Sequence, residues 1–332
     1  MILHIDKNTD PKKLQQLADK YEAIILKNRD FDILITPSSL KKIEDSDQKY
    51  VDESFVFDTD IQLASRKYFN GKRSIKIGNK YIGGDSSNVL IAIGPCSVES
   101  EEQITQTAEL LKRIGLNTLR AGSFKPRTSP YTFQGLGLEG LKLLDNIRRK
   151  YGFTIITEVR DSTHADEVIE YADIIQIGAK SMYDHGILRK CAKTLKPVLL
   201  KRGFGTTVQE FVQAAEFILS GGNPNVILCE RGIRTFETKT RFTLDLCSAA
   251  YLKENTNLPV ILDPSHAMGY AYGVPDLARA CMAMGVEGLL IEVHPNPSVA
   301  LSDASQQLNH EQFTDLFESL KIIAKAINRT II

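Results

Sequence analysis

Eight short apolar runs, each followed by a helix-like stretch, occupy residues 88–332. Most of the runs are β-branched or leucine-rich through their length, which is typical of strands buried on both faces of a parallel sheet. The stretches between them are amphipathic, as in EEQITQTAELLKRIG and TVQEFVQAAEFILSGG. Eight strand–helix repeats predict a (β/α)8 TIM barrel, with functional residues at the carboxyl ends of the strands. The runs are NVLIAIGPC (88–96), TLRAGSFK (118–125), FTIITEVR (153–160), DIIQIGAK (173–180), PVLLKRG (197–203), NVILCERG (225–232), LPVILDPSH (258–266) and GLLIEVHP (288–295).

Residues 1–70 follow a different pattern, which predicts a small ferredoxin-like α+β domain preceding the barrel. The first strand is ILHI, and DPKKLQQLADKY reads as a helix with Asp10 as its N-cap and Pro11 at its first position. EAIILKN and FDILITP predict two further strands, SLKKIEDSD (39–47) a second helix, and ESFVFD a last strand. This segment is the candidate regulatory domain.

Residues 71–87 are expected to link the two domains. Within them, RSIKIGNKYIGG predicts a hairpin that turns at Gly78-Asn79. Since the hairpin comes just before the first barrel strand, we expect it to close the amino-terminal mouth of the barrel.

The charge balance and the cysteines limit the partners and the cellular location that we expect of this protein. Lys plus Arg equals Asp plus Glu, at 41 each, so a general binder of nucleic acid or anionic membranes is not expected. No apolar run reaches the roughly 20 residues of a membrane span, and the N-terminus lacks the apolar core of a signal peptide. The five cysteines form no C-x-x-C pair and are expected to be reduced thiols, which favours a cytoplasmic protein.

Basic residues gather at the predicted strand ends. Because parallel strands bring their carboxyl ends to one mouth, these cations would repel one another unless an anion lay among them. A substrate with both a phosphate and a carboxylate fits such a set, since guanidinium groups bind both in a bidentate way. In the alternative interpretation, each cation is a solvated loop charge or pairs with a strand-end glutamate. This can explain any one of the cations, but it does not explain why all six occur at the predicted strand ends. They are Arg120, Lys125, Arg127, Lys180, Lys201 and Arg231.

A second set of strand-end residues suggests a metal site. Cys96, His266, Glu292 and Asp303 offer one thiolate, one imidazole and two carboxylates, a mixed set that suits one divalent transition metal such as Mn, Fe, Co or Zn. Taken singly, Cys96 could be a buried thiol. His266 could be a histidine satisfied by a carboxylate such as Asp263 or Glu292.

Seven motifs in order along the barrel resemble those of 3-deoxy-D-arabino-heptulosonate 7-phosphate (DAHP) synthase, type I, β-subgroup, in the branch with an N-terminal ferredoxin-like domain. This family carries out the first step of the shikimate pathway. The motifs are GPCSVES (94–100), RAGSFKPRTSPYTFQGLG (120–137), IQIGA (175–179), PVLLKRGF (197–204), ILCERGIRTFE (227–237), LDPSH (262–266) and EVHPNPSVALSD (292–303).

The resemblance implies a metal-dependent transferase that joins phosphoenolpyruvate to erythrose 4-phosphate and releases phosphate. It implies that the divalent metal is held by Cys96, His266, Glu292 and Asp303. Lys125, Lys201 and Arg231 would be catalytic, with Lys125 as the proton donor to the aldehyde oxygen. Phosphoenolpyruvate would be bound by Arg120, Lys125, Lys180, Lys201 and Arg231, and erythrose 4-phosphate by Arg127 and Thr128.

One position departs from the family. Members usually carry Arg, often followed by Asn, where this chain has Lys180-Ser181. Lysine keeps the charge but loses the two-pronged geometry of a guanidinium.

Two alternatives to this activity stay open. The related 3-deoxy-D-manno-octulosonate 8-phosphate synthase has an Asn-Arg-Ser type of stretch where this chain has Pro126-Arg127-Thr128, which favours the four-carbon aldehyde. A barrel without activity should have lost a metal ligand or the Lys125–Arg127 pair, and neither is lost. The family also implies a homotetramer, and the N-terminal domain either binds an aromatic amino acid (tyrosine or phenylalanine) or serves only in assembly.

Overall fold

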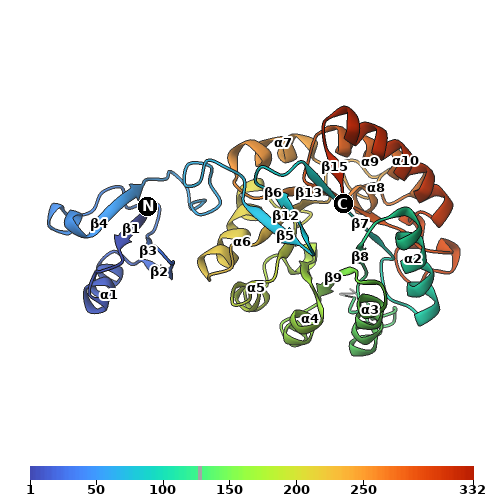
Figure 1. Ribbon diagram of the computed structural model, residues 1–332, viewed down its shortest axis with the longest axis horizontal. Coiled ribbons are helices and arrows are strands. Elements are labelled where there is room, and N and C mark those ends of the chain that lie inside the picture. Colours follow the sequence, from blue (N-terminus) through green and yellow to red (C-terminus); the bar gives the residue numbers. More distant parts are fainter. Residues whose placement is uncertain (126–128) are drawn as a thin grey trace.

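The computed structural model describes residues 1–125 and 129–332 and contains a closed parallel barrel (Figure 1). Neighbouring strands pair in chain order, and the last strand pairs with the first, with Gly288 opposite Leu90 and Glu292 opposite Gly94. All eight predicted strands are confirmed. They are β7 (Asn88–Gly94), β8 (Thr118–Arg120), β9 (Thr154–Val159), β10 (Ile174–Ile177), β11 (Val198–Lys201), β12 (Val226–Glu230), β13 (Val260–Leu262) and β14 (Gly288–Glu292).

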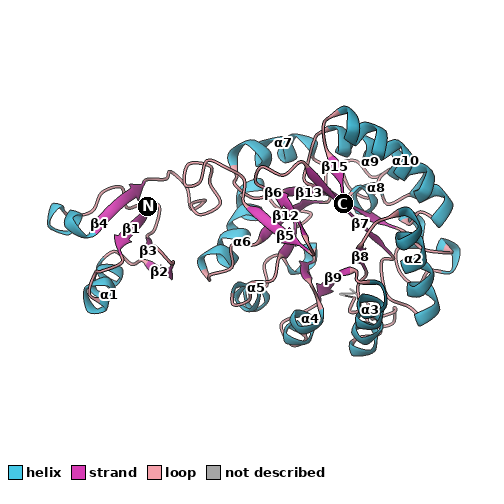
Figure 2. Cartoon of the chain, viewed as in Figure 1, coloured by secondary structure: helices cyan, strands magenta, loops and turns pink. Residues whose placement is uncertain are grey.

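Helices surround the barrel strands, as Figure 2 shows. In α2, Ile104, Ala108 and Leu111 are spaced to share one face, and all three are fully buried. Ser100 caps the start of this helix and Gly115, in a left-handed conformation, ends it. The helices are α2 (Glu101–Ile114), α3 (Leu138–Tyr151), α4 (Ala165–Tyr171), α5 (His185–Ala192), α6 (Val208–Ser220), α7 (Leu246–Asn255), α8 (Pro264–Met268), α9 (Val274–Ala283) and α10 (His310–Ala326).

The amino-terminal end of the barrel is filled by the predicted hairpin. Strands β5 (Ser74–Ile77) and β6 (Lys80–Gly83) pair antiparallel around Gly78, whose φ is +58°. Ile75, Ile77 and Ile82 from the hairpin join one buried cluster with inward-facing residues of the barrel strands. The opposite mouth, at the carboxyl ends of the strands, therefore remains for ligands.

A short strand at the end of the chain was not predicted. β15 (Thr330–Ile331) pairs in parallel with the start of β7, at Asn88 and Val89. The last residue, Ile332, belongs to the same buried cluster as the hairpin isoleucines.

The N-terminal segment forms a separate four-stranded sheet with the strand order β2-β3-β1-β4, and every neighbouring pair is antiparallel. Helix α1 is capped by Asp10, and its Leu14, Leu17 and Ala18 pack on Leu3 and other apolar residues of the sheet. The elements are β1 (Ile2–Asp6), α1 (Pro11–Lys20), β2 (Ile24–Lys27), β3 (Phe31–Ile35), the 3₁₀ helix η1 (Asp45–Tyr50) and β4 (Val51–Phe55).

The second helix predicted over residues 39–47 is wrong. Residues 39–44 form no helix, and η1 follows them. The stretch holds only two apolar residues, too few for a buried helical stripe. In addition, the carboxylate of Asp47 is buried and accepts hydrogen bonds from Lys20 (2.7 Å) and the hydroxyl of Tyr21 (2.8 Å). These contacts stabilise the observed conformation, with Asp47 in η1, over the predicted helix.

The segment after β4 is docked on the barrel. Leu63 and Ala64 are buried, and the carboxylate of Glu216 on α6 accepts hydrogen bonds from the backbone N–H groups of Gln62 (2.7 Å), Leu63 (3.1 Å) and Ala64 (2.8 Å). Arg66 donates to backbone carbonyl groups of α7 and of the residue that follows it. The link between the two units is therefore held by specific polar contacts. Among the described residues, no helix has both the length and the apolar character to cross a bilayer.

Candidate active site

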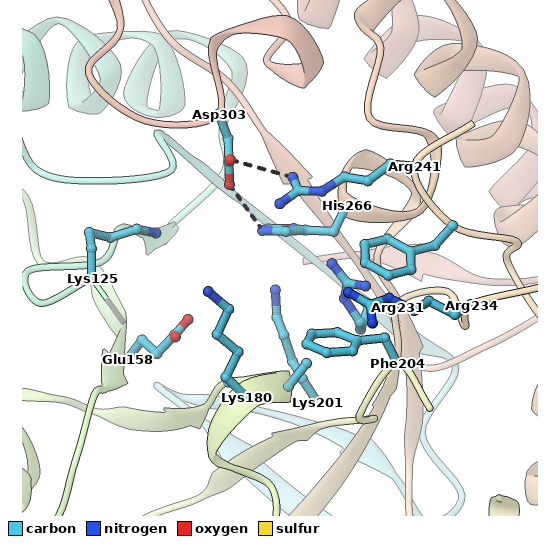
Figure 3. A pocket seen from close by; sticks show the side chains of 13 residues that line it. Lys125, Glu158, Lys180, Lys201, Phe204, Arg231, Arg234, Arg241, His266 and Asp303 are labelled. Carbon is cyan, nitrogen blue, oxygen red and sulfur yellow. Dashed lines mark ion pairs between the residues drawn. The ribbon is translucent and has the colours of Figure 1, made fainter. Parts of the chain in front are cut away.

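A cavity of about 450 Å³ opens at the carboxyl ends of the barrel strands (Figure 3). The ammonium groups of Lys125, Lys180 and Lys201 point into it, the last two side by side. They come from the loop after β8, from the 3₁₀ turn after β10 and from the end of β11. Arg231, the residue after β12, also lines the cavity, as do His266 and Asp303. Arg127 and Thr128 lie outside the described residues.

The four predicted metal ligands lie together. One ligand atom from each of Cys96, His266, Glu292 and Asp303 falls in a group whose members are all within 4.8 Å of one another. The Nε2 atom of His266 is 3.4 Å from a Glu292 oxygen and 3.8 Å from an Asp303 oxygen, and the Cys96 Sγ atom is 3.2 Å from the same Asp303 oxygen. Such a convergence of acidic and soft ligands is the arrangement that a divalent cation requires.

Asp263 orients the His266 ring toward this group. Asp263 caps α8, and one of its oxygens accepts a hydrogen bond from the backbone N–H of His266 (3.0 Å). Its other oxygen lies 2.8 Å from His266 Nδ1, which leaves Nε2 facing the ligand group. Burial lowers the pKa of His266, which favours the neutral ring that a metal needs. One ring nitrogen of His266 thus faces the Asp263 carboxylate and the other faces the ligand group.

The surroundings of the Cys96 thiol indicate how a bound cation would change its ionisation. It is fully buried, and burial, assisted by the nearby Glu292 carboxylate, raises its pKa to about 12. Lys125 donates hydrogen bonds to the sulfur (3.0 Å) and to the Cys96 carbonyl oxygen (3.1 Å). A bound divalent cation would lower this pKa and stabilise the thiolate together with the carboxylates of Glu292 and Asp303. The donor set therefore fits such an ion.

Arg120 is buried beneath the cluster with a donor to spare. Its side chain donates to Glu292 (2.7 Å) and to Gln176 (3.1 Å). Its second terminal nitrogen, Nη2, is buried and has no hydrogen-bond partner among the described residues, although Glu158 lies 3.7 Å away. A buried unsatisfied guanidinium N–H is unfavourable, so it marks a place for an anionic ligand.

Two further cations differ in their role. The ammonium group of Lys201 is 2.6 Å from a carboxylate oxygen of Asp263, which also faces His266. Burial disfavours the charged carboxylate of Asp263, but the neighbouring His266 and Lys201 outweigh this effect and hold its pKa well below its usual range. Arg202, in contrast, is paired with Glu230 (2.8 Å) and Asp245 (3.1 Å) and does not line the cavity.

Sequence reasoning did not single out several residues of the site. Gln176 lies inside the IQIGA motif, where an amide within an apolar strand was the available signal. Arg241 lies 3.4 Å from Asp303 and donates to Gln306 (2.6 Å), which in turn donates to Glu292 (2.6 Å). These contacts join residues 65 and 14 positions apart, so no local sequence pattern predicts them.

The chain is similar to known proteins over most of its length. A family model described as the DAHP synthetase I family matches residues 68–329. Phospho-2-dehydro-3-deoxyheptonate aldolase of Thermotoga maritima is 44% identical over 266 residues, which cover 80% of this chain and 78% of the relative. A 2-dehydro-3-deoxyphosphooctonate aldolase of Bordetella petrii is 34% identical over 272 residues, covering 75% and 94% of the two chains.

Solved structures give the same picture. The crystal structure of the Thermotoga maritima phospho-2-dehydro-3-deoxyheptonate aldolase (DAHP synthase) superposes with a TM-score of 0.81 at 37% identity, covering 100% of this chain and 99% of that one. A truncated form of the DAHP synthase from the same organism has a TM-score of 0.76 at 41% identity and covers 81% of this chain and 98% of that one.

Proposed function

Because the chain belongs to the DAHP synthetase I family, we propose that its cavity joins phosphoenolpyruvate to erythrose 4-phosphate and water, giving DAHP and phosphate in the first step of the shikimate pathway. One observation supports this above the others. His266 and Asp303 of the four-residue ligand group line a single cavity at the carboxyl mouth of the barrel, together with the buried cations Lys125, Lys201 and Arg231. Two anionic substrates can be held side by side there, although they would repel each other in water.

We assign phosphoenolpyruvate to the deep cations. Arg120 offers Nη2, which has no hydrogen-bond partner among the described residues, Lys201 and Arg231 are almost completely buried, and Lys125 donates a hydrogen bond to the Cys96 sulfur. Lys180 is exposed at the rim and is assigned to the phosphate of the same substrate. Erythrose 4-phosphate is assigned to Arg127 and Thr128 by resemblance alone.

Cys96, His266, Glu292 and Asp303 are assigned to one divalent metal ion. When bound, such an ion supplies a Lewis acid that polarises the aldehyde oxygen. Asp263 contributes by fixing the His266 ring, and Arg241 by contacting Asp303 from the outer side.

The residues then act on defined atoms. C3 of phosphoenolpyruvate attacks the aldehyde carbon of the sugar phosphate, and Lys125 donates a proton to the aldehyde oxygen as it becomes a hydroxyl. Burial opposes the positive charge of Lys125, but the neighbouring Cys96 and Glu158 raise its pKa, so the amine holds the proton that it must give. Water then adds at C2 and loses one proton to solvent. The C2–O bond to the phosphate breaks as the new hydroxyl becomes the C2 carbonyl and its proton passes to the phosphate, and Lys201 and Arg231 stabilise the departing phosphate.

The octulosonate activity is the second candidate, because a relative of that name is 34% identical. The 44% identity to a heptonate aldolase favours the four-carbon aldehyde. The test is the release of phosphate from phosphoenolpyruvate with erythrose 4-phosphate or with arabinose 5-phosphate, in the presence of each divalent metal. Turnover with arabinose 5-phosphate alone would overturn the proposal, and no turnover with either sugar would indicate a barrel without activity.

We also infer a domain division into a ferredoxin-like domain (1–70), a linker and hairpin (71–87) and the barrel (88–332). The antiparallel strand order β2-β3-β1-β4 with α1 between β1 and β2 supports the first assignment. We place the protein in the β-subgroup branch with this domain by the resemblance of its motifs, and the similarity to a Thermotoga DAHP synthase structure covers the N-terminal segment as well as the barrel.

Regulation and assembly belong to the same proposal. An aromatic amino acid is the proposed effector of the N-terminal domain, the homotetramer the proposed assembly, and the cytoplasm the proposed location. The five unpaired cysteines support the last of these. Titration of activity with tyrosine and phenylalanine, with the molecular mass measured in the same buffers, tests the first two. Insensitivity to both would leave the domain with a role in assembly only.

A further inference from the structure

Arginine and phenylalanine side chains alternate along one wall of the cavity. We call this group the Arg–Phe stack, and Figure 3 shows Arg231 and Arg234 next to Phe204, with Arg241 farther along the wall, toward Asp303. The Cζ atom of Arg231 is 4.2 Å from the centre of the Phe242 ring and 5.8 Å from that of Phe204. The Cζ atom of Arg234 lies 5.1 Å from the Phe204 ring, and that of Arg241 lies 5.9 Å from the Phe242 ring. The two rings are 5.5 Å apart and almost parallel.

The rings take the place that a carboxylate usually has beside a buried arginine. Arg231 is only 4% exposed, and within residues 1–125 and 129–332 no carboxylate lies within ion-pair distance of it. The one hydrogen bond that its side chain makes to a described residue goes to the Gly232 carbonyl oxygen at 3.4 Å, which is long. The face of an aromatic ring attracts a guanidinium without neutralising its charge. Arg231 is thus held in place with its full charge available to a ligand.

Backbone contacts fix both rings. The N–H of Arg234 donates to the carbonyl oxygen of Phe204 (2.7 Å), and the N–H of Phe242 donates to that of Ala267 (2.8 Å), next to His266. Gly232, with φ +94°, allows the close approach, because a Cβ atom there would lie 2.7 Å from Cβ of Phe242. The wall therefore has one defined arrangement.

We infer that Phe204 and Phe242 are positioning residues for the phosphate of phosphoenolpyruvate, acting through the guanidinium groups of Arg231 and Arg234. The inference rests on the proposed function, since it takes Arg231 as a ligand of that phosphate. A carboxylate in place of either ring would hold the arginines equally well but would compete with the substrate. The ring faces avoid that competition.

The test replaces the ring of Phe242 while keeping its bulk. F242L should raise the KM for phosphoenolpyruvate on the order of tenfold, as expected for the loss of a desolvated cation–π contact, and change kcat far less. F242Y, which keeps the ring face, should restore the KM. The KM of F242L for erythrose 4-phosphate should stay unchanged. F236L is the matched control, because Phe236 lies in the same loop and is 98% exposed.

The inference is overturned if F242L, with an unchanged melting temperature, binds phosphoenolpyruvate as the wild type does. It is also overturned if F242Y is as impaired as F242L, because shape and not the ring face would then matter. F204L and F204Y repeat the comparison from the second ring in case F242L does not fold. R231K distinguishes a failure of the Arg231 assignment from a failure of the proposed role of the rings. An unchanged KM in R231K would refute the assignment of Arg231, whereas a raised KM in R231K with normal F242L and F204L would refute only the role of the rings.

Discussion

The carboxylate of Glu216 gives a prediction whose sign depends on which of two effects is larger. Burial beneath residues 62–64 disfavours the charged carboxylate, whereas three backbone N–H donors favour it. Burial is the larger effect and raises the pKa of Glu216 from 4.5 to about 7. The side chain as a whole is only partly covered, and it is the carboxylate end that the linker encloses.

The raised pKa makes the docking of the linker depend on pH. Undocking returns Glu216 to its ordinary pKa, so the docked state binds the proton more tightly. The contribution of Glu216 is then complete below pH 4.5 and is lost as the pH rises through 7. An increase of this size corresponds to about 3 kcal/mol in all, of which about 2–3 kcal/mol falls between pH 5 and pH 8.

Hydrogen exchange of the three amides measures this directly. After correction for intrinsic rates, the protection of the N–H groups of Gln62, Leu63 and Ala64 should fall on the order of 100-fold from pH 5 to pH 8. E216Q should abolish this dependence on pH, and E254Q, at an exposed position of α7, should keep it. Protection that increases with pH in the wild type would refute the reasoning, because the three donors would then outweigh burial.

Three further predictions concern the metal group, the rim and the hairpin. C96S should lower the amount of bound divalent metal and the turnover on the order of 100-fold or more, with the melting temperature nearly unchanged, and a chelator should inactivate the wild type reversibly. Metal analysis and phosphate release measure these effects, and full activity of the wild type in chelator would contradict the prediction. K180R should lower the KM for phosphoenolpyruvate about fivefold, because a guanidinium binds phosphate in a bidentate way, and a raised KM would show that the site is shaped for lysine. I82A removes a fully buried side chain of the hairpin and should lower the free energy of unfolding by about 2–5 kcal/mol with kcat/KM retained; a urea midpoint equal to that of the wild type would show that the hairpin is not part of the core.

Local sequence patterns were sufficient for the barrel. Each strand is buried on both faces, so its apolar run is continuous and stands out from the amphipathic helices. The hairpin could be predicted because a Gly-Asn pair separates two alternating runs. The segment over 39–47 could not, because the position of Asp47 depends on Lys20 and Tyr21, more than 25 residues away.

The candidate site was predictable as far as it lies at strand ends. Cys96, His266 and Glu292 follow apolar runs, and topology then brings them together. Phe242 follows no strand, and its ring acquires a role only through contact with Arg231. Asp263 was visible as a carboxylate near His266, but its second contact, with Lys201, depends on the pairing of distant strands.

The hairpin that fills one end of the barrel has a kinetic consequence. Because the hairpin fills the amino-terminal end, ligands enter and leave past the rim at the carboxyl ends of the strands, where Lys180 and Arg234 are exposed, while Arg120 and Lys201 are buried deeper in the barrel. We therefore expect a ligand held by these inner cations to bind before a ligand that lies nearer the rim, because the second ligand would block the way to the first.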